Sequence, residues 1–203
     1  FISLLNQIRE NKASEATLQA LNQRYIPNFV PPKEGNYIRL TTHNAPAQYI
    51  NEQQLAALPA QSFSFTAEIE GDFPETSYPA DFKLTLKPGA QVMFIKNDPQ
   101  HRFYNGMIGE VIGVRTDEDG SKITVRSKDS GEEFDLEKME WTNAKYTLNE
   151  KTKEIEETVE GKFMQYPLRL AWAITIHKSQ GLTFEHAIID ASRSFTHGQT
   201  YVA

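Results

Sequence analysis

The sequence predicts an α/β domain that is interrupted by a small β-barrel. A strand, a helix and a second strand are expected within residues 37–69, an order typical of α/β domains. Residues 83–136 instead hold several short strands at intervals of about 8–12 residues, a spacing typical of a barrel or sandwich. After Phe163 the α/β pattern returns. We therefore expect one α/β domain whose two parts flank a β-rich insertion.

The chain begins with two predicted helices and a proline-rich connection. Leucine and isoleucine recur at helical spacing within residues 1–24, on both sides of the polar run 12–15. Ser14 is a suitable N-cap for the second helix, because its side chain can accept a hydrogen bond from a free backbone N–H group. Three prolines within residues 27–32 then end the regular structure.

The first part of the α/β domain follows this connection. Residues 37–40 are expected to form a short strand, and residues 45–58 an amphipathic helix. Residues 62–69 alternate polar and apolar side chains, which is the pattern of a half-buried strand.

The β-rich insertion has its own turn signals. The Asn105-Gly106 pair favours a tight turn, and the charged segment 145–162 is expected to form a long exposed hairpin. Short strands are expected at residues 83–87, 90–95, 108–114, 122–126 and 133–136.

The composition excludes several classes of protein. Of the 203 residues, 39% are hydrophobic and 24% charged, so the chain is neither collagen-like nor disordered throughout. Cysteine is absent, which excludes disulfides and thiolate metal sites and fits a reducing compartment, so we expect a cytoplasmic protein. The net charge is −6, and 14 of the acidic residues lie within residues 115–162. A nucleic acid would therefore bind elsewhere on the chain.

The most informative polar segment is residues 173–184, which lies between two apolar runs. Gly181 allows a ligand to approach the backbone closely, and the polar side chains before it suit phosphate groups. The alternative is a polar helix face that ends at a glycine cap. The polar side chains concerned are Thr175, His177, Lys178, Ser179 and Gln180.

Segments at both ends of the α/β pattern resemble motifs of one enzyme family. Residues 166–181 (Tyr-Pro-Leu-Arg-Leu-Ala-Trp-Ala through Gly181) resemble motif V of superfamily 1B DNA helicases of the Pif1 and RecD2 type. Residues 197–203 resemble the opening of their motif VI, and residues 1–24 the helices that close their first RecA-like domain.

Two further segments carry the same resemblance in the same order. Residues 41–44 (Thr-Thr-His-Asn), followed by Asn51 and Leu55, resemble the motif that starts the second RecA-like domain of these helicases. Residues 87–93 and 105–109 resemble their inserted SH3-like domain.

The resemblance implies a RecA-like domain of the P-loop NTPase type, called 2A, that is interrupted by an SH3-like β-barrel, called 2B. Residues 1–34 would close the preceding RecA-like domain, residues 35–86 and 164–203 would form the two parts of 2A, and residues 87–163 would form 2B. The chain would be part of a longer protein.

The resemblance also implies site residues. Gln180 and Gly181 would face the nucleotide and sense its γ-phosphate, and Thr183 stands where related enzymes often place a ribose-binding glutamate. The residues expected to contact DNA are Thr42, Asn44, Thr175, His177 and Ser179 in 2A, and Lys96, Asn97 and Phe103 in 2B.

Several catalytic signatures are missing from the sequence. No Gly-x-x-x-x-Gly-Lys-Ser/Thr motif occurs, and Ala191 follows Asp190 where a Walker B strand would have a second acidic residue. The arginine of motif VI, which stabilises charge on the transferred phosphoryl group, would lie beyond Ala203. We therefore expect no catalytic residue in this chain and no ATP hydrolysis by it alone, with ATP and Mg²⁺ bound by the longer protein.

Other candidate residues have plainer interpretations. None of the five histidines forms an H-x-x-x-H pair, so no metal site is expected. The aromatic residues Phe94, Phe103 and Tyr104 could stack bases, but packing in the core or at its rim is favoured for each. Trp141 and Trp172 are expected to anchor the core.

Two functions remain open at this point. The resemblance implies an ATP-dependent 5′-to-3′ DNA helicase that acts on single-stranded DNA and duplex junctions in replication, repair or recombination, with no membrane partner. The alternative is a non-enzymatic module, built from a degenerate helicase fold, that binds a protein or a nucleic acid. The polar cluster 175–180 favours the helicase, because a purely structural module does not need it.

Overall fold

The computed structural model describes residues 1–32, 35–117, 120–148, 155–191, 194 and 197–202. The chain divides into two compact units, which are described separately. Unit 1 consists of Phe1–Asn44 and Ile174–Ala203, and unit 2 consists of Ala45–Ala173. Helices and mixed sheets together confirm the predicted α/β class. None of the described helices is long and apolar enough to cross a membrane.

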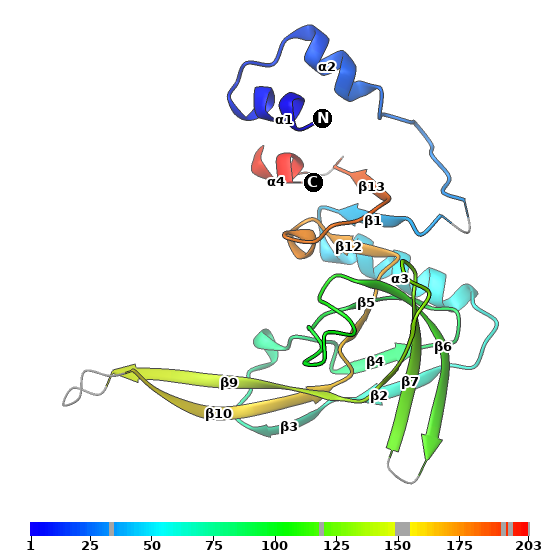
Figure 1. Cartoon of the computed structure of the whole chain (residues 1–203), viewed down its shortest axis with the longest axis vertical. Coiled ribbons are helices and arrows are strands. Elements are labelled where there is room, and N and C mark those ends of the chain that lie inside the picture. Colours follow the sequence, from blue (N-terminus) through cyan, green and yellow to red (C-terminus); the bar gives the residue numbers. More distant parts are fainter. Residues whose placement is uncertain (33–34, 118–119, 149–154, 192–193, 195–196, 203) are drawn as a thin grey trace. The chain divides into compact units, whose positions relative to one another are not determined.

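Unit 1 contains a three-stranded sheet formed by segments from both ends of the chain (Figure 1). The strand order is β12-β1-β13, and β1 pairs with β13 in parallel. A strand was expected at residues 37–40, and β1 confirms it. The elements are α1 (Ile2–Arg9), α2 (Glu15–Asn22), β1 (Ile38–Thr41), β12 (Ala173–Thr175), the 3₁₀ turn η2 (His177–Ser179), β13 (Ala187–Asp190) and α4 (His197–Val202).

The two N-terminal helices begin as the sequence predicts. Ser14 is the N-cap of α2, and its Oγ accepts a hydrogen bond of 3.2 Å from the backbone N–H of Thr17. The Thr17 hydroxyl accepts a bond of the same length from the backbone N–H of Ser14. This reciprocal capping box satisfies two N–H groups that the first turn of a helix leaves free.

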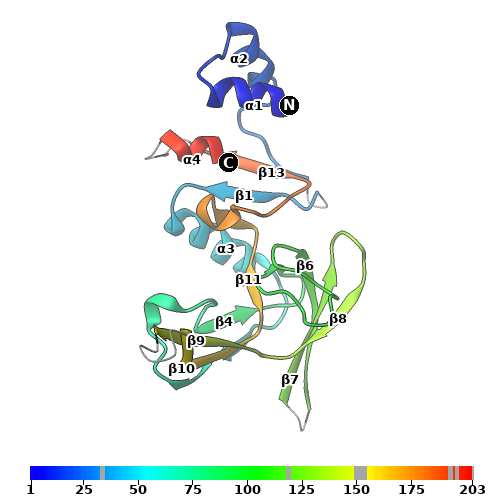
Figure 2. The same cartoon turned by 60° about the vertical axis from the view of Figure 1, so that its left-hand side comes forward.

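Unit 2 consists mainly of antiparallel strands, which follow helix α3 (Figure 2). Three sheets have the orders β11-β5-β6-β7-β8, β3-β10-β9 and β2-β4. The elements are α3 (Asn44–Ala57), β2 (Phe63–Thr66), β3 (Glu68–Gly71), the 3₁₀ turn η1 (Glu75–Ser77), β4 (Lys83–Leu86), β5 (Gln91–Phe94), β6 (Ile108–Asp117), β7 (Gly120–Ser127), β8 (Glu133–Leu136), β9 (Met139–Leu148), β10 (Ile155–Gln165) and β11 (Leu168–Leu170).

Three expectations about unit 2 need correction. The predicted strand 62–69 is two strands, because the chain changes partners at Ala67: β2 pairs with β4, whereas β3 pairs with β10. The predicted barrel is not confirmed, since the five-stranded sheet is open and no pairing among the described residues joins β8 to β11. Leu168–Leu170, expected in the returning α/β part, forms an edge of this sheet against β5.

Aromatic rings fill the centre of the main core of unit 2. Phe94 and Phe103 are almost completely buried, and their ring centroids lie 4.4 Å apart in a stacked arrangement. Phe134 meets both rings edge-on. The packing interpretation is therefore confirmed for Phe94 and Phe103, whereas Tyr104 is exposed. Trp141 and Trp172 are half-buried against the hydrophobic clusters of unit 2.

The predicted exposed hairpin is confirmed as the ribbon β9–β10 (Figure 1). Strand β3 joins this ribbon only along Glu68–Gly71, opposite Met164–Gly161. A bulge follows in β10 between Val159 and Gly161. At this point the backbone N–H of Asp72 donates to the carbonyl of Glu160 over 2.8 Å, so the chain leaving β3 passes close to Gly161.

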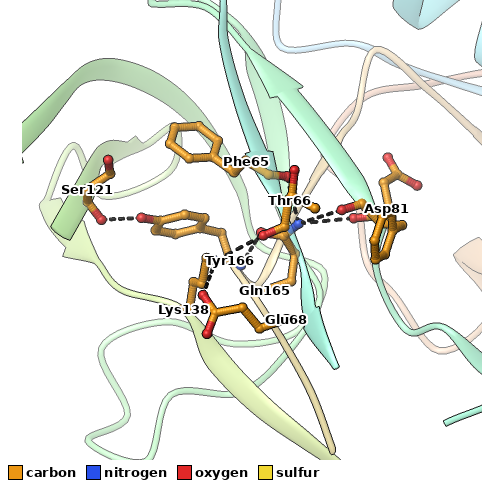
Figure 3. A network of polar contacts seen from close by, with 9 residues as sticks. Phe65, Thr66, Glu68, Asp81, Ser121, Lys138, Gln165 and Tyr166 are labelled. Atoms are coloured by element: carbon orange, nitrogen blue, oxygen red, sulfur yellow. Dashed lines mark hydrogen bonds and ion pairs between the residues drawn. The ribbon is translucent and has the colours of Figure 1, made fainter. Parts of the chain in front are cut away.

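A buried glutamine connects the separate sheets of unit 2 (Figure 3). Gln165 is fully buried, and its Nε2 donates to the carbonyls of Phe65, Asp81 and Phe82 over 3.0, 3.2 and 3.3 Å. Its Oε1 accepts the backbone N–H of Tyr166 over 3.0 Å. One side chain thus links the end of β10 to β2 and to the segment before β4.

The loop after β5 is organised by a buried carboxylate. Asp98 is 4% exposed and accepts hydrogen bonds from the backbone N–H, Nε and Nη2 of Arg102 over 3.1, 2.8 and 2.9 Å. The hydrogen bonds from Arg102 lower the pKa of Asp98 from 3.8 to about 2, although burial opposes the shift.

We expect Asp98→Asn to destabilise the chain at neutral pH but not in strong acid. Because the pKa of Asp98 is lower in the folded state, its ionised form stabilises the fold above about pH 4. This stabilisation is lost as the pH falls from about 4 through 2. The free energy of unfolding should fall by about 2 kcal/mol at pH 7. Urea denaturation at pH 7, 4 and 2 measures this free energy for both proteins.

Asp129→Asn is the control for this prediction, because the carboxyl of Asp129 is exposed. It should change the free energy of unfolding by less than about 0.5 kcal/mol at each pH. A loss at Asp98→Asn that stays constant down to pH 2 would contradict the prediction.

Candidate functional site

The strands of unit 1 bring their carboxyl ends to one edge of the sheet. The register of the parallel pair places Thr41 opposite Asp190. The backbone N–H of Ile176, just after β12, donates to the carbonyl of Thr41 over 2.9 Å. All three strands therefore end side by side. In open α/β sheets, ligands bind outside this edge of the sheet.

The loop after β1 is held by its own threonines. The Thr41 hydroxyl donates to the carbonyl of His43 over 2.9 Å. The Thr42 hydroxyl lies 2.8 Å from Nδ1 of His43, and Thr42 is 5% exposed. Asn44 is exposed at the start of α3. Of the two residues predicted here to contact DNA, Thr42 packs inward and Asn44 lies on the surface.

The turn after β12 divides its polar side chains into two groups. Thr175 and Ser179 are buried and hold the turn: the Thr175 hydroxyl accepts from the backbone N–H of Lys178 over 3.4 Å, and the Ser179 hydroxyl donates to the carbonyl of Ile176 over 2.7 Å. The exposed group is His177, Lys178 and Gln180. The alternative of an extended polar helix face is not what forms here, since η2 is a single turn of three residues.

Gly181 ends this turn in a left-handed conformation, with φ of +76°. A Cβ atom at this position would have no neighbour within 4 Å, so the space beside the backbone is open. Thr183 follows and is exposed. The three residues predicted to bind nucleotide, which include Gln180, thus lie together on an accessible stretch of chain.

Gln199 is a residue of this site to which the sequence analysis gave no role. It is 4% exposed, and its Nε2 donates to the carbonyl of Thr42 over 3.0 Å. Its Oε1 lies 3.2 Å from the hydroxyl of Ser194. Gln199 thereby fixes the loop after β1 from α4. The only sequence signal was its position within the segment that resembles motif VI.

The three predicted DNA contacts of the β-rich part lie in unit 2 and differ in exposure. Lys96 is half-buried, its Nζ donates to the carbonyl of Glu140, and it lies 4.7 Å from the ring centre of Trp141. Burial lowers the pKa of Lys96, and Glu140 opposes this shift. Asn97 is exposed, and its Oδ1 accepts the backbone N–H of Asn105 over 2.8 Å.

Phe103 does not fit its predicted role as a DNA contact. Its ring is 3% exposed and stacks on Phe94 within the core, so it is inaccessible to a base in this structure. Among the described residues, no group of three or more histidines and carboxylates could hold a metal ion, and we assign no Mg²⁺ ligand to this chain.

Comparisons with known proteins give a consistent result. No family model matches the chain. The chain is 36% identical to an ATP-dependent DNA helicase Pif1 from Psychrobacter sp., over 99% of this chain and 36% of that protein. It is 33% identical to an ATP-dependent DNA helicase Pif1 from Bdellovibrio bacteriovorus, over 100% of this chain and 44% of that protein. The chain therefore spans less than half the length of these relatives.

Solved structures show the same similarity. The unliganded Pif1 from Bacteroides sp matches with a TM-score of 0.86 and 38% identity, over 99% of this chain and 45% of that chain. A Bacteroides Pif1 bound to single-stranded DNA matches with a TM-score of 0.73 and 39% identity, over 100% of this chain and 45% of that chain. A further match, with a TM-score of 0.85 and 38% identity, is a complex of Bacteroides sp Pif1 with ADP-AlF4, over 99% of this chain and 45% of that chain.

Proposed function

We propose that this chain, which belongs to the Pif1 family of DNA helicases, is part of an ATP-dependent helicase. That helicase would move 5′ to 3′ along single-stranded DNA and unwind duplexes. In this proposal the chain supplies a RecA-like domain, 2A, with an SH3-like 2B insertion, divided at the boundaries that the sequence analysis gives. ATP and Mg²⁺ would bind to the longer protein.

The carboxyl edge of the sheet in unit 1 carries this proposal. His177, Lys178 and Gln180 are exposed there, beside the open backbone of Gly181. Thr41 connects the loop after β1 to this turn through the backbone of Ile176. A short polar turn between two apolar strands thus presents hydrogen-bonding groups where phosphate-containing ligands bind in such folds.

Each exposed side chain then has a distinct role. Gln180 would contact the γ-phosphate of ATP, and Gly181 would let the nucleotide approach the backbone, with Thr183 nearby. His177 would contact the DNA strand, together with Asn44. Thr42, Thr175 and Ser179 would act on DNA through the backbone that they hold, since their side chains are buried. Lys96 and Asn97 remain proposed contacts of the 2B insertion.

We expect the full-length protein to hydrolyse ATP in response to single-stranded DNA. Gln180→Ala should lower the stimulated kcat by about a hundredfold, the usual effect of removing one preorganised donor to a developing charge. His177→Ala should weaken binding of a single-stranded oligonucleotide by about tenfold, as expected for the loss of one stacking or hydrogen-bonding contact. Steady-state ATPase assays and fluorescence anisotropy measure the two effects.

Gln54→Ala is the matched control, because Gln54 is an exposed glutamine of α3 to which the proposal gives no role. It should leave both measurements unchanged. If the full-length protein neither binds DNA nor hydrolyses ATP, the helicase proposal is wrong and the binding module takes its place. A strand-displacement assay on substrates with 5′ or 3′ tails decides the direction of movement.

A further inference from the structure

Asn51 of α3 binds both backbone groups of one residue in the strand that leads into the polar turn. Its Nδ2 donates to the carbonyl of Ala173 over 2.8 Å, and its Oδ1 accepts the N–H of Ala173 over 2.9 Å. Ala173 is 1% exposed. The side-chain amide therefore replaces the neighbouring strand that Ala173 would otherwise need to satisfy its backbone.

The position of Asn51 on α3 is unusual for a polar residue. It lies four residues after the buried Ala47 and four before Leu55, which packs on the main core of unit 2. Residues at this spacing share one face of a helix. A polar side chain on a buried face is unfavourable unless it is hydrogen-bonded. The two bonds to Ala173 explain why an asparagine lies on the helix face that also carries Ala47 and Leu55.

Residues 41–51, which contain Asn51, also hold the other end of β12. The carbonyl of Thr41 accepts from the N–H of Ile176, and the Thr41 hydroxyl, which donates to the carbonyl of His43, also lies 3.4 Å from the carbonyl of Ile174. Residues 41–51 thus contact β12 at its first residue, at its second residue and just after its end. β12 lies at an edge of its sheet, with β1 as its one strand neighbour among the described residues. Its register therefore depends on these few bonds.

We propose that Asn51 is a positioning residue, which fixes Ala173 and thereby sets where the polar turn 175–180 stands relative to the loop 42–44. The inference rests on the proposed function, in which the turn contacts both the nucleotide and DNA. With Asn51 in place, the loop and the turn move as one body. Without it, β12 can slip along β1, and binding of DNA no longer places Gln180 correctly.

The test uses the full-length protein with Asn51→Ala. We expect the kcat of DNA-stimulated ATP hydrolysis to fall by about tenfold to a hundredfold, since a displacement of about 1 Å far from the reacting atoms has effects of this size. The KM for ATP should stay within about twofold, because Asn51 touches no ligand. Asn51→Asp keeps the acceptor for the N–H of Ala173 but loses the donor, so its kcat should be intermediate.

Two control variants separate positioning from plain stability. Gln48→Ala changes an exposed residue of the same helix, whose side chain donates to the carboxylate of Glu52, and should have wild-type kinetics. Gln165→Met removes a buried amide elsewhere and should lower the melting temperature while kcat stays unchanged below that temperature.

The outcomes are distinguishable. If folded Asn51→Ala retains wild-type kcat, the positioning role is wrong. The role is also wrong if Gln165→Met and Asn51→Ala lose kcat in the same proportion to their loss of melting temperature, because Asn51 would then act only through stability. If Asn51→Ala does not fold, Asn51→Asp decides in the same way. If the wild-type protein itself shows no DNA-stimulated hydrolysis, the proposed function has failed instead.

Discussion

Gly161→Ala is expected to lower the free energy of unfolding by about 3 kcal/mol, the upper part of the range for overpacking a tight site. A Cβ atom at Gly161 would overlap the backbone of Asp72, where the chain leaves β3. Backbone atoms cannot turn aside as a flexible side chain can, so β3 and β10 would have to separate. The bonds beside this point, such as that from Asp72 N–H to the carbonyl of Glu160, would be lost.

Gly113→Ala is a matched control for this change. Gly113 also follows a bulge in a long strand, β6, and neither glycine has the positive φ angle that would itself strain an alanine. A Cβ atom at Gly113 would have no neighbour within 4 Å. Alanine there should be neutral or stabilise by about 0.4–1 kcal/mol, because it restricts the unfolded chain. Urea denaturation compares the two variants, and equal effects would refute the steric explanation.

Gln165→Met should destabilise the chain by about 3 kcal/mol, because it keeps the unbranched shape of the side chain but removes its hydrogen bonds. Each buried carbonyl or N–H group left without a partner costs about 1–3 kcal/mol. The variant affects the groups of Phe65, Asp81, Phe82 and Tyr166. Partial rearrangement should keep the total below the sum of these costs.

The control for this second change is Gln54→Met, at an exposed position of α3. It should alter the free energy of unfolding by less than about 0.5 kcal/mol. Chemical denaturation followed by circular dichroism gives both values. A loss of less than about 1 kcal/mol at Gln165→Met would show that the buried amide contributes no more than an ordinary hydrogen bond.

Elements with a local signal could be predicted from the sequence. The N-cap at Ser14, the helix at 45–58 and the hairpin within 145–162 each depend on neighbouring residues, and each is confirmed. The partners of strands could not be predicted in this way. Alternation within residues 62–69 reads as one strand, but the two halves pair with strands that lie far apart in the sequence. Whether β8 pairs with β11, and so whether the sheet closes into a barrel, likewise depends on contacts between strands that lie far apart in the sequence.

The candidate site shows the same division between local and distant causes. The clustering of polar residues in 175–180 could be seen directly in the sequence, and the structure places them in one turn. Which of them face outward depends on the geometry of a single 3₁₀ turn, so Thr175 and Ser179 were not distinguished from His177. For Phe103 the sequence favoured packing over a DNA contact, but its stacking partner Phe94 lies across a loop and could not be identified from neighbouring residues.

Unit 1 is built from two segments that lie far apart in the sequence, which has a consequence for biosynthesis. Its central strand β1 receives both neighbours from the far end of the chain, and the bond from Thr41 to Ile174 spans 133 residues. At ribosomal rates of about 5–20 residues per second, β1 emerges roughly 7–27 s before β12 and β13 are available. Unit 2 is continuous in sequence and is synthesised during this interval. The nascent chain thus carries an unpaired strand that chaperones would have to shield until β12 and β13 have been synthesised.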